Sequence, residues 1–204
     1  MCANVELDIF LKKGAFSLNQ LFSLLEVRGL HVNFKEMCSY DDWEFTNGTS
    51  IDPGSFDKDT SDLFLKKFTC TYFTVNNKWR CSLLTSLEDT CMQLSFGLNT
   101  DDLLRPGETD YEDAVIQLYD HVADSINDAM SKDPLKGRFL VASMGVEYSI
   151  GHFQSDITTM VDNDNAPIWI VPKESGKHIP LKNFEKEEKS DTIVFRKNLE
   201  NMCF

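Results

Sequence analysis

The stretch KKFTCTYFTVNNKWRCSLLTSLEDTCMQLSFGL, residues 66–98, decides the fold of this chain. It holds three runs in which β-branched, aromatic and other apolar residues dominate, as is typical of strands. Asn76 and Asn77 offer a turn between the first two runs, and Glu88 and Asp89 offer one between the last two. The pattern predicts an antiparallel meander with one packed face and one polar face. The three runs are residues 66–75, 80–87 and 92–98.

Further strands are expected on both sides of the meander. In residues 5–13, apolar residues alternate with a second set that includes Asp8. Pro167 and Pro172 flank the run at 166–173 and suggest that this run lies at a sheet edge. Residues 47–62 are expected to be a loop, and residues 181–191 a charged connector. The other expected strands are 30–34, 139–150 and 191–198.

Two principal helices are predicted, at about 17–28 and 109–131. Each begins with a capping box, formed by Ser17 and Gln20 in the first helix and by Thr109 and Glu112 in the second. Apolar residues at helical spacing follow each box. The order of elements predicts a single α+β domain, residues 1–204, with a mainly antiparallel sheet on which the two helices pack.

Charge and composition exclude several classes of function. The net charge of −13 disfavours nucleic acid as a direct ligand, because such binding normally requires a basic surface. No apolar run approaches the roughly 20 residues that span a bilayer, and the first ten residues lack the features of a secretory signal. A cytoplasmic protein without a membrane partner is expected. Its six cysteines form no C-x-x-C pair and are expected to be reduced thiols.

Acidic residues are concentrated in and before the second predicted helix. Residues 101–133 hold ten acidic residues against two basic ones, which is a net charge of −8. Such a concentration produces a local field that favours a cationic partner. One face of the helix carries what we call the acidic ladder, at spacings of three or four residues. The acidic ladder comprises Asp113, Gln117, Asp120, Asp124 and Asp128.

Four interpretations of the acidic ladder were weighed. A divalent metal site would need ligands from further elements, and acid–base catalysis would need one carboxylate set apart from the others. A solvated helix face and a docking surface for a basic protein fit the pattern better. The sequence leaves both of these open.

A second candidate for partner binding lies in the segment CSYDDWEFT, residues 38–46. Aromatic residues alternate there with acids, and aromatic anchors surrounded by carboxylates suit an interface that receives a basic surface. The alternative is a strand whose aromatic face belongs to the core. The candidate residues are Tyr40, Asp41, Asp42, Trp43 and Glu44.

The remaining motifs predict no catalytic residue, metal or cofactor. DNDNAP, residues 162–167, begins like a calcium loop but has Pro167 in place of the required glycine. EYSIGHFQSD, residues 147–156, brings His152 and Asp156 close in sequence without a nucleophile elbow. There is no glycine-rich motif for binding phosphates.

Taken together, the size, the acidity, the helix 109–131 and the aromatic–acidic segment give a profile that resembles the immunity proteins of bacterial polymorphic and contact-dependent toxin systems. The resemblance is to the class, and no motif aligns. It implies a protein that binds a cognate toxin, often a cationic nuclease, and neutralises it. The acidic ladder and the 40–45 segment would then imitate the charge of nucleic acid.

Two other classes of function stay open. One is a small hydrolase or transferase whose site is assembled only in three dimensions, and a buried carboxylate or histidine in a deep pocket would favour it. The other is an adaptor or structural subunit, which a large exposed apolar patch would favour. The sequence does not fix the oligomeric state.

Overall fold

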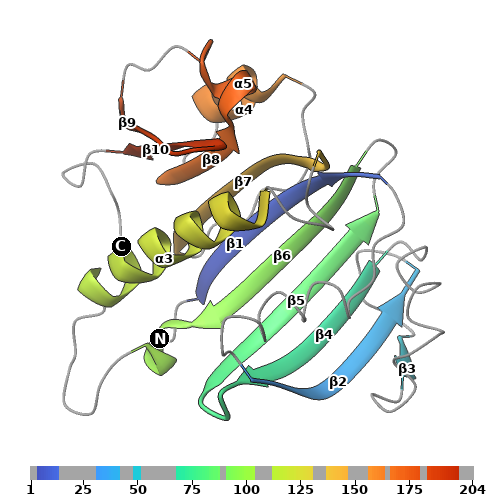
Figure 1. Cartoon of the computed structure of the whole chain (residues 1–204). Helices are drawn as coiled ribbons and strands as arrows, with labels where there is room; N and C mark the ends of the chain where they lie inside the picture. The colour runs from blue at the N-terminus through green and yellow to red at the C-terminus, as the bar shows by residue number, and fades with distance from the viewer. Residues whose placement is uncertain are drawn as a thin grey trace.

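The computed structural model describes residues 4–13, 31–41, 48–51, 68–87, 91–103, 112–130, 137–146, 156–163, 166–179 and 183–197. Within these ranges, ten strands form one sheet in which neighbouring strands run antiparallel (Figure 1). The order across the sheet is β3-β2-β4-β5-β6-β1-β7-β8-β10-β9. The strands are β1 (Asn4–Lys12), β2 (Val32–Tyr40), β3 (Thr49–Ile51), β4 (Phe68–Val75), β5 (Trp79–Leu87), β6 (Cys91–Asn99), β7 (Phe139–Val146), β8 (Ile168–Pro172), β9 (Phe184–Glu188) and β10 (Thr192–Lys197).

The predicted meander is confirmed as β4, β5 and β6, which pair in that order. The turn between β4 and β5 has Asn76 and Asn77 at φ of 52° and 56°, and Lys78 N donates to Val75 O at 3.0 Å. Two consecutive left-handed residues match the twist of a tight hairpin, and asparagine tolerates that conformation better than most residues. The local sequence therefore dictates this hairpin. The proposed turn at 88–89 lies outside the described residues.

The central strands are buried on both faces. In β1, Ile9 and Leu11 belong to one core cluster, whereas Phe10 between them belongs to another. The same alternation holds in β8, where Ile170 faces the first cluster and Trp169 the second. Apolar side chains therefore lie on both faces of these strands.

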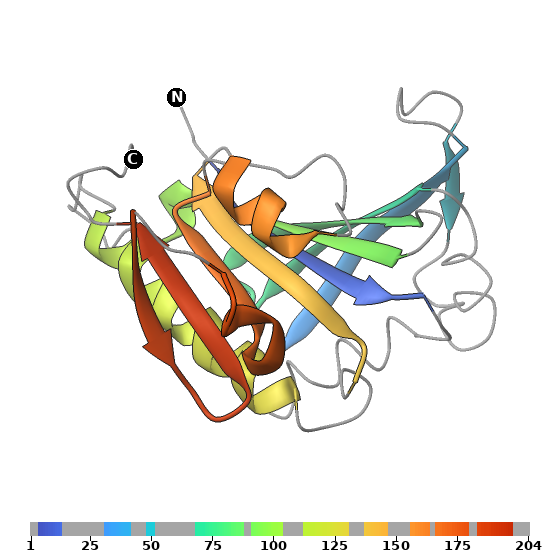
Figure 2. The same cartoon turned by 90° about the horizontal axis from the view of Figure 1, so that it is seen from above.

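A different helix covers each face of these central strands. The first core cluster takes in residues of α3 (Glu112–Met130), and the second takes in residues of α4 (Ile157–Asn163). Figure 2 shows α3 and α4 on opposite sides of β7. The buried residues that α3 contributes are Val115, Tyr119, Ala123 and Ile126.

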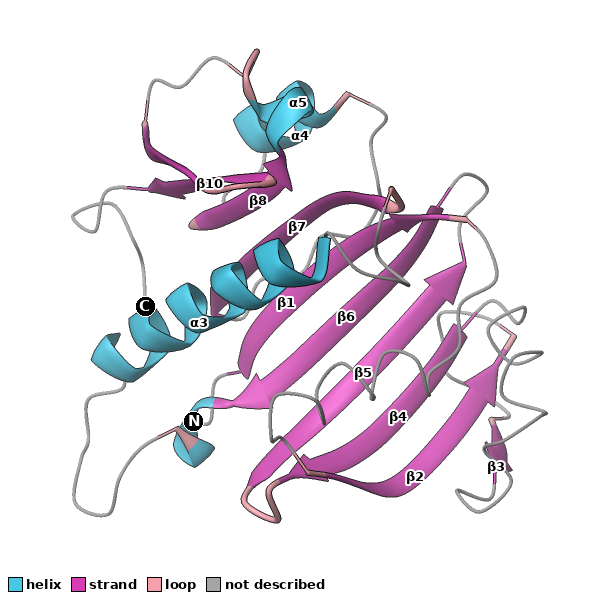
Figure 3. Cartoon of the chain, in the orientation of Figure 1, coloured by secondary structure: helices cyan, strands magenta, loops and turns pink. Residues whose placement is uncertain are grey.

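The helices were predicted in part. α3 lies within the helix expected at 109–131, whereas the helix expected at 17–28 lies outside the described residues. α4 and the short α5 (Lys173–Gly176) were not predicted from the sequence (Figure 3). Asp156, weighed earlier as a catalytic residue, caps α4: its Oδ1 accepts from Thr158 N at 3.0 Å and its Oδ2 from Thr159 Oγ1 at 2.6 Å.

The predicted edge position of residues 166–173 is wrong, because β8 lies between β7 and β10. Pairing between β7 and β8 ends at Ile170, so Pro172 lies beyond it. The missing N–H of this proline therefore removes no hydrogen bond between β7 and β8. Pro167 precedes the strand. The two prolines therefore mark the ends of a central strand.

Two segments expected to lack regular structure contain strands. The connector at 181–191 holds β9, and the loop at 47–62 holds β3. β9 is the last strand of the sheet, and four of its five residues are exposed and charged. Charged residues are the usual protection of an exposed sheet edge against pairing with another chain. Such a strand has no apolar periodicity that the sequence could reveal.

No helix in the described ranges is both long enough and apolar enough to cross a membrane.

An ion pair between Arg80 and Asp102 joins the start of β5 to the segment that follows β6. Asp102 lies in a 3-10 turn, Thr100–Asp102, that follows β6. Its carboxylate accepts from the Arg80 guanidinium, with Nη2 2.9 Å from Oδ1 and Nε 3.0 Å from Oδ2. The backbone N–H of Arg80 also donates to Oδ2 at 2.8 Å. A two-pronged contact of this kind is the strongest form of the pair.

We predict that Asp102→Asn lowers the free energy of unfolding at neutral pH by about 0.5–1 kcal/mol, because it weakens these charge-assisted hydrogen bonds, which solvent around the exposed Arg80 partly screens. Hydrogen bonds from Arg80 hold the pKa of Asp102 below the usual value for aspartate. The stabilisation is therefore present above the unfolded-state pKa of about 4 and is lost as the pH falls through the lower folded-state pKa. Urea unfolding of variant and parent should converge in acid.

The control is Glu174→Gln, which removes an exposed ion pair with Lys177. It should change stability by less than about 0.5 kcal/mol. A stability loss for Asp102→Asn that is the same in acid as at neutral pH would contradict the prediction.

Candidate functional site

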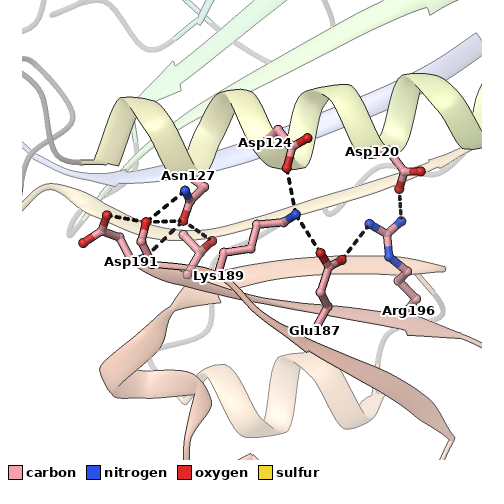
Figure 4. A network of polar contacts seen from close by, with 9 residues as sticks. Asp120, Asp124, Asn127, Glu187, Lys189, Asp191 and Arg196 are labelled. Atoms are coloured by element: carbon pink, nitrogen blue, oxygen red, sulfur yellow. Dashed lines mark hydrogen bonds and ion pairs between the residues drawn. The ribbon is translucent and has the colours of Figure 1, made fainter.

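The polar side of α3 faces the hairpin formed by β9 and β10 (Figure 4). Arg196 Nη1 lies 2.7 Å from Asp120 Oδ1, and Lys189 Nζ lies 2.7 Å from Asp124 Oδ1. Glu187 joins the two pairs, with Oε1 2.8 Å from Lys189 Nζ and Oε2 3.3 Å from Arg196 Nη2. We call these five residues the α3–hairpin network.

Sheet register explains why the basic residues meet the helix. Val194 packs in the core cluster beneath α3, so Arg196, two residues further along β10, points to the same face. Glu187 pairs with Val194 in the neighbouring strand and shares that face. On the helix, Asp120 and Asp124 are one turn apart and point the same way.

Asn127 extends the contact by another turn of α3. Its Oδ1 accepts from Asp191 N and Thr192 Oγ1, each at 3.1 Å, and its Nδ2 donates to Ser190 Oγ at 3.1 Å. One amide thereby fixes the hairpin against the helix. Sequence reasoning missed Asn127 because it considered mainly charge, although Asn127 lies three residues after Asp124 on the same face.

In each ion pair of the network, the basic side chain is less exposed than the carboxylate. The two basic side chains are largely covered, with Lys189 17% and Arg196 22% exposed. The three carboxylates are open to solvent, with Asp120 56%, Asp124 64% and Glu187 49% exposed. Cations lie beneath and anions outside, so an approaching molecule meets carboxylates that the cations hold in place.

Two residues of the network, Lys189 and Glu187, have shifted pKa values. Burial opposes the charged form of Lys189, but hydrogen bonds to Asp124 and Glu187 outweigh it and raise the pKa of this lysine. The hydrogen bond from Lys189 also lowers the pKa of Glu187. Both groups therefore stay ionised at neutral pH.

The structure places the remaining predicted residues as follows. Gln117 and Asp128 are exposed on α3, and Asp113 lies in α3, although its side chain is not described. Tyr40 ends β2 close to Gly48, where an added Cβ would come within 2.3 Å of the tyrosine ring. Asp41 is exposed, and Asp42, Trp43 and Glu44 lie outside the described residues.

The two predicted partner-binding regions are far apart in the sheet order. Tyr40 belongs to β2, next to one end of the sheet, whereas the α3–hairpin network involves β9 and β10 at the other end. The fold therefore does not bring Tyr40 into one small patch with Asp120 and Asp124 (Figure 1).

A second polar group lies in the centre of the sheet. Asp8 in β1 is only 1% exposed, and its Oδ1 accepts from Gln93 Nε2 at 3.1 Å and from Ser95 Oγ. Ser86 Oγ donates to Gln93 Oε1 at 3.4 Å, so a chain of hydrogen bonds ends on the carboxylate. We call Asp8, Ser86, Gln93 and Ser95 the Asp8 cluster. The sequence analysis placed Asp8 among the residues opposite the apolar face and did not expect its burial.

In the described part of the chain, no group of three or more His, Cys, Asp and Glu residues could hold a metal ion.

No family model, no curated protein and no solved structure matches the chain. The chemistry of its own residues is therefore the basis on which a function can be argued.

We predict that Asn127→Ala lowers the free energy of unfolding by about 1–3 kcal/mol, because it leaves the donors of the hairpin turn without their acceptor. Gln117→Ala is the matched control on the same helix, since Gln117 is exposed. It should change stability by less than about 0.5 kcal/mol. Chemical denaturation followed by circular dichroism measures both, and equal effects would contradict the anchoring role of Asn127.

We also predict that Asp8→Ala lowers the free energy of unfolding by about 1–3 kcal/mol, because it removes the acceptor that Gln93 Nε2 and Ser95 Oγ share inside the sheet. Ser143→Ala is the control on the neighbouring strand. Ser143 pairs with Asp8 in the register, and its buried Oγ has no hydrogen-bond partner among the described residues. Loss of that hydroxyl should therefore be neutral or stabilising. A Ser143→Ala variant as unstable as Asp8→Ala would show that packing, and not hydrogen bonding, matters at this position.

Proposed function

We propose that this chain is an acidic, non-enzymatic binding protein, and that it acts as an immunity protein by binding and neutralising a basic toxin domain. The observation that carries the proposal is the difference in exposure between the two partners of each ion pair in the α3–hairpin network. Their carboxylates are exposed, whereas their cations are largely covered. This surface offers fixed negative charge to a cationic partner.

The network favours recognition for two physical reasons. A carboxylate already held by a neighbouring cation loses little side-chain entropy when a partner binds. A partner also approaches a chain of net charge −13, which raises the rate of encounter for a basic surface. Asp128, exposed one turn beyond Asp124, extends the negative face along α3.

Asp8 favours a second candidate, a small hydrolase or transferase, because buried carboxylates often serve in catalysis. However, Gln93 and Ser95 both donate to the same oxygen of Asp8, and these hydrogen bonds join β1 to β6. The carboxylates of the α3–hairpin network are also held by hydrogen-bonding partners, but they are open to solvent, whereas Asp8 is buried. We therefore place the function at the network.

Two double variants test this proposal. One removes the two carboxylates of α3, and the other removes both cations, which pair with Glu187 as well as with these carboxylates. Asp120→Asn with Asp124→Asn removes the exposed carboxylates, whereas Lys189→Gln with Arg196→Gln keeps them and removes the cations. The binding partner in this test is the basic protein that the unmodified chain captures from a lysate of its native host. We expect the carboxylate variant to associate about tenfold more slowly at low salt, and the cation variant to associate as fast as the parent or faster.

The cation variant loses four ion pairs and the carboxylate variant two, so the cation variant should lose at least as much stability. Slower association of the carboxylate variant alone therefore reports recognition and not folding. The contrast in association rate should shrink as salt rises, because exposed charges are screened. Equal association rates for the two variants would place recognition elsewhere on the chain.

A further inference from the structure

Two cysteines face each other across neighbouring strands. Cys38 in β2 and Cys70 in β4 are directly paired in the antiparallel register. Residues paired in this way have Cα atoms about 4.5 or 5.5 Å apart, depending on the type of pair. Both separations lie in the range of about 4.4–6.8 Å that a disulfide spans. The backbone separation of this pair is therefore compatible with a bond between the two sulfurs.

Both thiols are free and half-buried, so they are accessible to a small reagent. Side-chain hydrogen bonds join Tyr40 to Cys38 and Tyr72 to Cys70. Tyr72 is exposed, so solvent reaches this group of two cysteines and two tyrosines at the Tyr72 side chain. Cys38 Sγ also lies 3.6 Å from Glu36 Oε1, to which it donates.

The other described cysteines face residues other than cysteine in the strand register. Cys81 in β5 pairs with Phe73 on one side and Leu98 on the other. Cys91 in β6 pairs with Lys12 and is fully buried. Among the described cysteines, the facing arrangement is thus specific to Cys38 and Cys70.

We propose that Cys38 and Cys70 form a reversible oxidation site, which a low-molecular-weight disulfide such as glutathione disulfide converts from a dithiol to a cross-strand disulfide. One cysteine thiolate attacks the small disulfide, forms a mixed disulfide and releases one small thiol. The second cysteine thiolate then attacks the protein sulfur of that mixed disulfide and releases the second small thiol. The two cysteines lose two electrons and two protons, and the small disulfide gains them.

The surroundings set the conditions under which this site reacts. Burial raises the pKa of the Cys70 thiol, and the Glu36 carboxylate and the Cys38 sulfur act in the same direction, although the hydrogen bond to Tyr72 opposes them. The thiol form is therefore favoured at neutral pH, and closure of the disulfide should speed up by about tenfold per pH unit below that pKa. A reducing compartment keeps the pair as a dithiol, and oxidation closes it.

The test uses the unmodified chain and mass spectrometry. The folded protein is equilibrated with glutathione buffers of increasing oxidised fraction at mildly alkaline pH, and free thiols are then alkylated. Trypsin releases Cys38 in the peptide 36–58 and Cys70 in the peptide 68–78, and each peptide contains no other cysteine. We expect these two peptides to become linked as the oxidised fraction rises and to separate again when dithiothreitol is added.

Single variants sharpen the result. In Cys38→Ser, the remaining Cys70 should stop at the glutathione adduct, because its partner thiol is missing. Cys81→Ser changes another half-buried thiol and should leave the link between the two peptides unchanged. The proposal is overturned if the unmodified chain carries only separate glutathione adducts on these peptides, keeps both thiols free, or links either cysteine mainly to another one. It does not depend on the proposed immunity function.

Discussion

Burial of the central strands on both faces is the constraint on which the rest of this structure depends. β1, β7, β8 and β10 contribute apolar side chains to both core clusters, so each face must be covered. α3 covers one face through Val115, Tyr119, Ala123 and Ile126, and α4 helps to cover the other. This packing fixes the rotation of α3 about its axis. The polar side of the helix is thereby directed at the hairpin of β9 and β10, where the α3–hairpin network forms.

Much of the sheet could be predicted because local signals and tertiary structure agree. The Asn76–Asn77 turn and the alternating runs of the meander specify their own geometry, and the long apolar stripe of α3 specifies a helix. β8 was assigned to an edge because its prolines were interpreted without knowing where its short pairing with β7 ends. β9 was missed because a charged edge strand is held by pairing with β10, which leaves no periodic pattern in its own sequence.

The candidate site was only partly predictable for a related reason. Helical spacing placed Asp120 and Asp124 on one face, but their partners Lys189 and Arg196 lie far along the chain and are brought close only by the fold. Asp8 appeared as one polar residue in an alternating strand, and the Asp8 cluster became visible only with the register to β6. Two residues of the acidic ladder, Asp120 and Asp124, thus pair with the hairpin and still face solvent.

The central claim is that these outward carboxylates recognise a cationic surface. The most direct test is the association rate of the unmodified chain with its captured partner, measured by stopped flow over a range of salt concentrations. The account predicts that the rate falls steeply as salt increases, while the dissociation rate changes much less. An association rate that is independent of salt would contradict it.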